Sequence, residues 1–449
     1  MLFWLVPTFQ ALLALIALCL VACEAFGRFS SRTPATPRPA AWWWVAGLIV
    51  SHAAVLALVF YAVRHQQPAE AWRSTMMPLI VIDVFHPARQ IDHGNLVATA
   101  MLWLAAFQSY ALLALYRQKP SRVAVGIGCG VMLLLSCAAP ALTSFDLYGY
   151  VRDVELGFAA YRPPHVPFPG AYRVFDLWLG KQRASAYGPL WLVVARLVTS
   201  VAATLLGKLL ALRVFSVLAY LAALAGLRAL RMPSRIIAVF ALNPGLMFQY
   251  VVDGHNDLIA IAVLVFAAAA VRRRPSLAFG LIAVAGLLKL PYALLGLPIV
   301  AAVRSVRVRV AGSIAMVAAV ATISWIAGGS SYLDRLIEHG TQNLSTGIRK
   351  LSDLVAVALI LLAAAGGRRL RSAVWLIPTL GAVIFPWYFI WGLPYALGRR
   401  RIFGYLLVCF PFVTMLVGVP FVLPLDVLVV ALWVIAISLR DPRAGLRGR

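Results

Sequence analysis

The sequence predicts an all-α polytopic membrane protein, and two features carry that prediction: a very high apolar content and an uneven distribution of charge. Hydrophobic residues make up 63% of the 449 positions and charged residues only 12%. Soluble domains average roughly 45–50% and 25%. No polar stretch is long enough for a separate soluble domain, so we expect residues 1–449 to form a single integral membrane domain.

Apolar segments long enough to cross a bilayer recur along the whole chain. A helix needs about 20 apolar residues to span the hydrocarbon core. The segments that approach this length lie near 2–23, 41–63, 97–116, 123–142, 188–206, 209–227, 236–252, 258–271, 277–303, 310–328, 352–366, 373–398, 402–419 and 421–439.

The formal net charge of +25 comes from arginines concentrated in short loops between these segments. Such loops are typical of the cytoplasmic side of a membrane protein, so membrane topology explains the charge and nucleic-acid binding is not expected. Twelve of the fifteen acidic residues lie in four other loops, which we therefore expect to share the extracytoplasmic face. These loops are 64–96, 143–187, 253–257 and 329–353.

Three segments do not fit this alternation as simple spans. Segment 188–227 has room for two spans where the charges allow one, so the first, which carries Arg196, is expected to re-enter or to lie in the membrane plane. Segments 277–303 and 373–398 have arginines at both ends, and each is too short to cross a core of ~30 Å twice. Each has a central break, at Lys289-Leu290-Pro291 and at Pro386-Trp387. Irregular backbone at membrane depth is tolerated only where protein or a wet cavity shields it.

The acidic loop 143–187 contains the first candidate for catalysis. Asp146 directly follows an apolar run, where partial desolvation is expected to raise the pKa of a carboxylate. A general base must reach the proton that it removes, and the mouth of a span allows this. The alternative is an ordinary solvated loop whose tyrosines anchor it at the interface.

A second cluster, Asp253-Gly254-His255-Asn256-Asp257, lies between two apolar segments. Ionisable groups at such positions indicate function by default. Ligation of a divalent metal by Asp253, His255 and Asp257 is an open alternative, although the set of oxygen ligands is incomplete.

Two further segments stand out by their side chains. Lys289 interrupts an apolar stretch, which favours anion binding over a snorkelling role at a helix end. The aromatic run Phe385–Trp391 fits an interface belt or a stacking floor for a sugar and a prenyl chain, and its spacing does not separate the two.

Together these motifs resemble polyprenol-phosphate-mannose-dependent mannosyltransferases of the membrane glycosyltransferase C superfamily, especially the actinobacterial α-1,6-mannosyltransferases. The resemblance covers about 135–395. It rests on five motifs in order: Ser144-Phe145-Asp146-Leu147-Tyr148-Gly149-Tyr150, Tyr187-Gly188-Pro189-Leu190, Asn243-Pro244 with His255-Asn256-Asp257, Leu287-Leu288-Lys289-Leu290-Pro291, and Pro386-Trp387-Tyr388. The chain departs from the family at Arg162-Pro163-Pro164, where an Asn-Pro-Tyr element is usual.

The resemblance implies a bundle of about 11–14 transmembrane or re-entrant helices in the bacterial inner membrane, with its active site on the extracytoplasmic side. It implies inverting transfer of a sugar, with mannose expected, from a polyprenyl-phosphate donor to a glycan or glycolipid acceptor, without a cofactor. Asp146 would be the general base. The implied donor or substrate residues are Tyr148, Tyr150, Arg152, Tyr187, His255, Asn256, Asp257, Lys289, Trp387 and Tyr388.

Two other functions remain as alternatives. Broken helices near mid-membrane are also typical of transporters and lipid flippases. The sequence shows no internal repeat, and its acidic cluster lies at loop mouths rather than at mid-bilayer. A non-catalytic scaffold for envelope assembly is the third possibility.

Overall fold

The computed structural model describes residues 41–66, 93–118, 120–139, 144, 146–162, 184–342, 390, 397 and 400–415. Within these residues all regular structure is helical, and no strand occurs. The predicted all-α class is therefore confirmed. Apart from the single positions 390 and 397, the expected segments near 2–23, 352–366, 373–398 and 421–439 lie outside the described residues.

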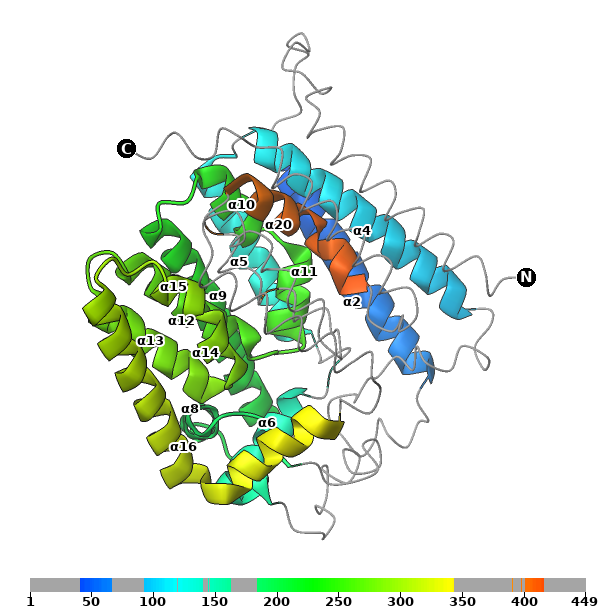
Figure 1. Ribbon diagram of the computed structural model, residues 1–449. Coiled ribbons are helices and arrows are strands. Elements are labelled where there is room, and N and C mark those ends of the chain that lie inside the picture. Colours follow the sequence, from blue (N-terminus) through cyan, green and yellow to red (C-terminus); the bar gives the residue numbers. More distant parts are fainter. Residues whose placement is uncertain are drawn as a thin grey trace.

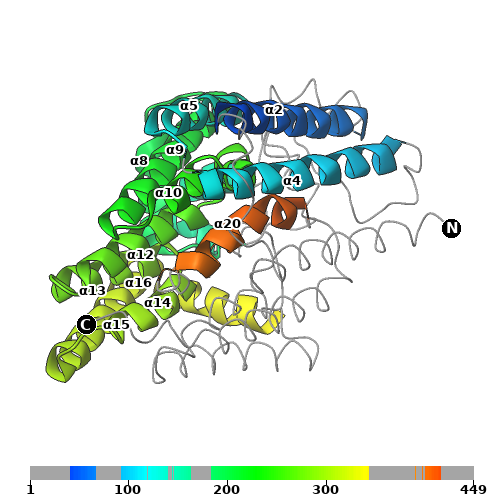
Figure 2. The ribbon, with the colours of Figure 1, turned by 90° about the horizontal axis from the view of Figure 1, so that it is seen from above.

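Long apolar helices form one side of the molecule. Helices α2 (Ala41–Gln66) and α4 (His93–Gln118) lie side by side, and α20 (Arg400–Met415) packs against α4 (Figures 1 and 2). The rings of Trp44 and Tyr110 meet edge to face at 5.5 Å. These residues lie at the start of α2 and late in α4, so the two helices are antiparallel.

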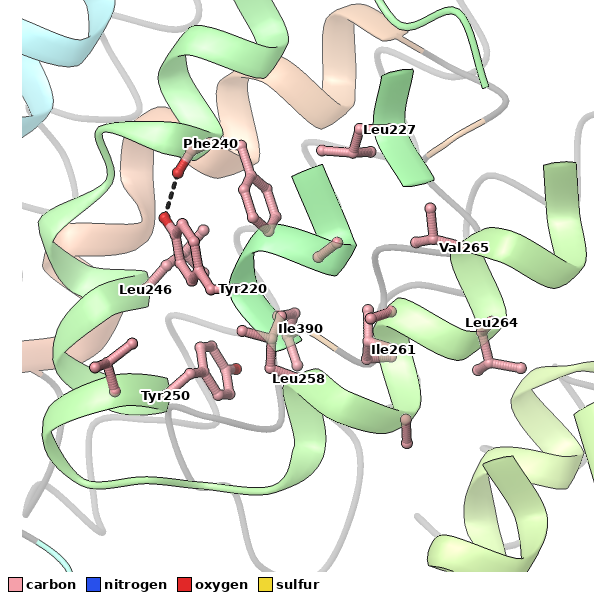
Figure 3. Packing of buried hydrophobic residues seen from close by; sticks show 14 of the residues in the cluster. Tyr220, Leu227, Phe240, Leu246, Tyr250, Leu258, Ile261, Leu264, Val265 and Ile390 are labelled. Atoms are coloured by element: carbon pink, nitrogen blue, oxygen red, sulfur yellow. Dashed lines mark hydrogen bonds between the residues drawn. The ribbon is translucent and has the colours of Figure 1, made fainter. Parts of the chain in front are cut away.

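The centre of the molecule is built around the long helix α9 (Leu205–Ala229). It packs against α8 (Pro189–Thr199), α10 (Ser234–Ala241) and α12 (Asp257–Ala270). Figure 3 shows the apolar packing in this region, where Tyr220 donates a hydrogen bond to the carbonyl of Phe240. The hydroxyl is thus satisfied although the side chain is fully buried.

Residues 257–342 supply the helices on the side of the molecule opposite α2 and α4 (Figures 1 and 2), whereas residues 122–138 form a helix that packs against α2. Helix α5 (Arg122–Ala138) begins at Ser121, whose hydroxyl accepts a hydrogen bond from the amide of Ala124. Helices α12 and α13 (Pro275–Leu288) form a hairpin, and α16 (Val306–Gln342) packs on α13. The short helices α14 (Pro291–Leu295) and α15 (Leu297–Val300) follow α13.

Three of the described helices, Ala41–Tyr61, Leu205–Ala229 and Val306–Asp334, are long and apolar enough to cross a membrane. A fourth candidate is the bent pair Ser234–Ala241 and Pro244–Val252. In α16 only 17% of the most apolar window is buried, and its outer face exposes large apolar side chains such as Ile326. Such a surface is typical of a helix that faces lipid.

The predicted break in segment 277–303 is confirmed. Helix α13 ends at Leu288, Lys289 adopts an extended conformation with φ −162° and ψ 120°, and the helix resumes only at Pro291. In segment 188–227 a re-entrant or in-plane placement of the first helix stays a prediction; that helix, α8, has 11 residues and a length of roughly 16 Å. That is too short to cross the bilayer.

The predicted apolar segment 236–252 is not one continuous helix. The chain bends by 48° between α10 and the segment formed by α11 (Pro244–Met247) and the π-helix η5 (Phe248–Val252). Asn243 causes the new start, because its side chain accepts a hydrogen bond from the amide of Leu246. Pro244 has no N–H and fits the first position of a helix.

Two regions expected to be loops contain helix. Helix α6 (Asp146–Leu156) and the 3-10 helix η3 (Gly157–Tyr161) occupy the start of 143–187, because α6 buries one apolar side that includes Leu147 and Val151. Helical residues also continue beyond 329, where Gly329 makes a kink with φ 56°. Glycine adopts such a positive φ without a steric penalty.

Candidate active site

Asp146 opens helix α6, where a carboxylate is favoured by the partial positive charge of the first turn. Its amide donates a hydrogen bond of 3.1 Å to the hydroxyl of Ser144. Its side chain is 31% exposed, whereas that of His255 has no exposed surface. The edge of the carboxylate is therefore open to a substrate.

His255 supports Asp146 from the protein interior. Its Nδ1 lies 2.8 Å from Oδ2 of Asp146, and its side chain has no exposed surface. Since an ionised carboxylate only accepts hydrogen bonds, Nδ1 carries the proton and donates it. The structure thus joins two predicted site residues that are 109 positions apart.

The electrostatic environment keeps Asp146 ionised. Burial raises the pKa of this carboxyl, but the hydrogen bond and charge of His255, the charge of Lys289 and the hydroxyl of Tyr150 lower it more. The net result is a pKa below the ordinary value of 3.8. The expectation of a raised pKa is therefore wrong, because desolvation is outweighed by neighbouring donors and cations.

Tyr150 links the two halves of the cluster. Its hydroxyl donates to Oδ2 of Asp146 at 3.4 Å and accepts a hydrogen bond from the amide of Asn256 at 3.2 Å. Asp146 and Tyr150 are four residues apart on one helix, so they share a face. This arrangement connects helix α6 to the loop that carries His255.

Asp257 forms a second acid–base group at the start of α12. Its Oδ1 lies 3.4 Å from Nζ of Lys289 and accepts a hydrogen bond from the hydroxyl of Tyr292. Asp257 is 1% exposed, whereas the side chain of Lys289 is 13% exposed. The break after α13 brings Lys289 to this position, because a continuous helix would place it elsewhere.

Tyr187 lies between the two groups. Its ring is 5.1 Å from that of Tyr150, and Nζ of Lys289 lies 5.6 Å from its centre. The amide of Gly188 donates a hydrogen bond of 2.8 Å to the carbonyl of Leu288, which fixes this segment to the end of α13. A cation over an aromatic face is attracted to it. Four of the five predicted motifs therefore meet at one site.

The remaining predicted residues fall into two classes. Tyr148 is buried on α6, and Arg152 is buried with its guanidinium bound to Asp153, at 3.1 Å from Nε and 2.7 Å from Nη2. Arg152 is thus turned into the protein rather than toward the exposed edge of Asp146. Trp387 and Tyr388 lie outside the described residues.

The carboxylates and the imidazole of the site form pairs with neighbouring side chains and do not gather around a common point as metal ligands would. Among the described residues, no three His, Cys, Asp or Glu side chains converge on a point where a metal ion could bind. His255 faces Asp146, and Asp257 faces Lys289 and Tyr292.

Sequence reasoning missed Tyr292 and Trp191, which complete the site. Tyr292 binds Asp257, and Trp191 packs edge to face on Tyr150 at 4.8 Å. A signal for Tyr292 exists, because it directly follows Pro291 at the predicted break. Trp191 gives no such signal, since an aromatic residue in an apolar helix is ordinary.

A comparison with protein families identifies the chain. The family model described as alpha-(1->6)-mannopyranosyltransferase, N-terminal domain, matches residues 45–307. The chain belongs to this family. The matched region of this mannosyltransferase family contains Asp146, His255 and Lys289, and membership supports a membrane glycosyltransferase. No curated protein and no solved structure gives a significant match.

Proposed function

We propose that the protein transfers mannose from a polyprenyl-phosphate donor to a hydroxyl of an extracytoplasmic glycan or glycolipid, with Asp146 as general base. The observation that carries the proposal is the Asp146 carboxylate, which is exposed at its edge and held from behind by His255 and Tyr150. A hydroxyl needs a base within hydrogen-bond reach when it attacks. Asp146 meets that requirement and is ionised at neutral pH.

The proposed step is an inverting displacement. The acceptor oxygen bonds to the anomeric carbon, its proton moves to Asp146, and the bond from that carbon to the donor phosphate oxygen breaks. The phosphate leaves as an anion, so it needs a cation rather than an acid. Lys289 supplies that charge in the proposal, because its ammonium acts on Asp146 and is therefore close to the reacting atoms.

The aromatic side chains give the donor a surface in the proposal. The ring of Tyr187 lies between the Asp146 and Lys289 groups, and it is half-buried rather than fully covered. A sugar ring packs on such a face while its phosphate meets the ammonium. Transport remains a different function for the same broken helix, but family membership supports a transferase.

Asp146→Asn tests the proposal. The amide keeps the shape and hydrogen bonding of the side chain but cannot take a proton, so turnover is expected to fall by about 10²–10⁴-fold. Donor binding and folding should stay unchanged. The assay is transfer from radiolabelled polyprenyl-phosphate mannose in vesicles, with binding of the same donor measured separately.

Glu155→Gln is the matched control. Glu155 is an acid on the same helix and pairs at the surface with Lys208 at 2.8 Å. A surface pair of this kind contributes little, so turnover should stay within about twofold of wild type. Near-normal turnover of Asp146→Asn would remove Asp146 from the mechanism.

A further inference from the structure

Arg213 is a completely buried arginine in the middle of α9, and its guanidinium binds main-chain carbonyls. Nη2 donates to the carbonyl of Val252 at 2.9 Å. Nη1 donates to the carbonyl of Cys137 at 3.3 Å and also to that of Ala139. One side chain thus binds three acceptors on two separate parts of the chain.

Those two parts precede the candidate base and its partner in the sequence. Ala139 ends α5 and precedes Asp146 by seven residues. Val252 ends η5 and precedes His255 by three residues. Since Asp146 and His255 meet at 2.8 Å, small shifts of either part would change their hydrogen bond.

The chemistry of the contact requires arginine. The last carbonyls of a helix have no partner within that helix and carry partial negative charge, which a cation satisfies. A guanidinium presents several donors in a fixed plane, whereas an ammonium is a single point charge on a flexible stem. The buried carboxylate of Asp253 attracts the guanidinium and offsets part of the cost of burying it.

We propose that Arg213 is a positioning residue that sets the geometry of Asp146 against His255 by holding the ends of α5 and η5 together. The inference rests on the proposed function for its catalytic consequence only. Its structural part, the coupling of two segments through one guanidinium, can be measured without any turnover.

The test is Arg213→Lys, which keeps the charge but cannot reach all three carbonyls. Amide hydrogen exchange should rise by about tenfold or more in both 146–150 and 253–257. Turnover should fall by about 10²-fold, the cost of a misplacement of about 1 Å. Apparent KM for the donor should change much less than turnover, because the main chains next to Tyr187 and at Lys289 are held by hydrogen bonds outside both segments, from Gly188 to Leu288 and from Lys289 to Ala285.

Tyr220→Phe is the matched control on the same helix. It deletes another buried hydrogen bond to a main-chain carbonyl, that of Phe240 (Figure 3), which belongs to neither segment. Exchange at 146–150 and 253–257 should not change in this variant. The proposal is overturned if Tyr220→Phe raises exchange in these segments as much as Arg213→Lys does. It is also overturned if exchange in Arg213→Lys rises in only one of the two segments.

The coupling can also be tested in the wild-type protein in case Arg213→Lys does not fold. Under mild denaturant, segments held by one group should open together with the same free energy. Different opening free energies for 146–150 and 253–257 would contradict the inference. Normal turnover of Asp146→Asn would instead disprove the proposed function and leave this exchange result standing.

Discussion

At the scale of the residue, the site separates an accessible base from a covered partner. Asp146 keeps 31% of its side chain exposed, while the His255 side chain behind it has none. Burial alone would raise the pKa of the carboxyl, and the surrounding donors reverse that effect. In the proposed mechanism the residue is consequently a base that stays ionised at all physiological pH values, at the cost of some basicity.

His255→Leu tests this balance. It removes the hydrogen bond and charge that lower the pKa of Asp146 and leaves burial, which raises it. Wild-type activity should therefore persist to acid pH, whereas the acid limb of kcat/KM in the variant should move to higher pH. The same sign applies to stability, because a lowered pKa in the folded state stabilises above the unfolded value and is lost as pH falls.

His52→Leu is the control for a buried histidine. His52 is 1% exposed and its Nε2 lies 2.8 Å from the hydroxyl of Ser136, within α2 and α5. Losing that contact should lower stability without moving the acid limb. An acid limb that stays in place in His255→Leu would show that His255 does not tune the base.

Lys289→Met tests the donor phosphate. Methionine keeps most of the stem and deletes the charge, so donor affinity should fall by about 10- to 150-fold, equivalent to about 1.5–3 kcal/mol for a charged hydrogen bond. Lys208→Met, at the ion pair with Glu155, should bind the donor normally. Binding is measured with the radiolabelled donor.

Asp257→Asn tests whether Lys289 binds the donor phosphate or serves only as the structural partner of Asp257. The carboxylate competes with the donor phosphate for Lys289, and Tyr292 continues to bind the residue at this position. If Lys289 binds phosphate, donor affinity should hold or rise in Asp257→Asn. A matching loss in Asp257→Asn and Lys289→Met would assign both residues to folding alone.

At the scale of the element, short breaks and close approaches build the site. Most of this was readable from the sequence, because Lys289-Leu290-Pro291 interrupts an apolar segment and the 188–206 segment conflicts with the charge pattern. The bend at Asn243-Pro244 was missed, although an Asn cap followed by proline is a start signal for a helix. The signal was overlooked because the residues on both sides of Asn243-Pro244 are apolar, so the segment reads as one uninterrupted helix.

The sequence predicted which residues belong to the site better than it predicted which partners each of them contacts. Tyr292 and Arg213 act through partners far away in sequence, and Arg213 lies inside an apolar helix where periodicity says nothing of its partners. The orientation of Arg152 was not predictable either. It depends on the adjacent Asp153, whose carboxylate accepts a hydrogen bond from the guanidinium inside the protein.

Gly188→Ala tests the close approach of the Tyr187 segment to α13. A Cβ at this position would collide with the carbonyl of Leu287, whose backbone cannot move without disturbing the break. We expect a loss of about 1–3 kcal/mol in the free energy of unfolding. Activity should fall with it, because Tyr187 is displaced. Thermal unfolding in detergent measures the stability.

Gly280→Ala is the matched control in the adjacent helix. Nothing lies within 4 Å of a Cβ built at Gly280 in α13. Alanine is favoured over glycine inside a helix by about 0.5–1 kcal/mol, so this variant should unfold at the same or a higher temperature. A stable Gly188→Ala protein would show that the segment does not need this contact.

At the scale of the whole molecule, contacts join three of the four acidic loops that were predicted to share a face, and most of the fourth, 64–96, lies outside the described residues. His255 in 253–257 binds Asp146 in 143–187, and Arg162 reaches Asp334, in the expected loop 329–353, at 3.5 Å. The arginine-rich segments 272–274 and 304–309 follow Val271 and Val303, which lie in one apolar region with Phe279. The α12–α13 hairpin thus separates the candidate site from this basic end.

The side of the membrane that each end faces is the last prediction. The positive-inside bias places the basic end in the cytoplasm and the site outside. Ala159 and Arg273 are exposed on the described surface and report the two ends, whereas Asp257 is too buried to label.

In a background without the five native cysteines, Ala159→Cys should react with an impermeant maleimide in intact cells. Arg273→Cys should react only after permeabilisation. The opposite pattern would put the site in the cytoplasm, where a nucleotide-sugar donor would become the better candidate.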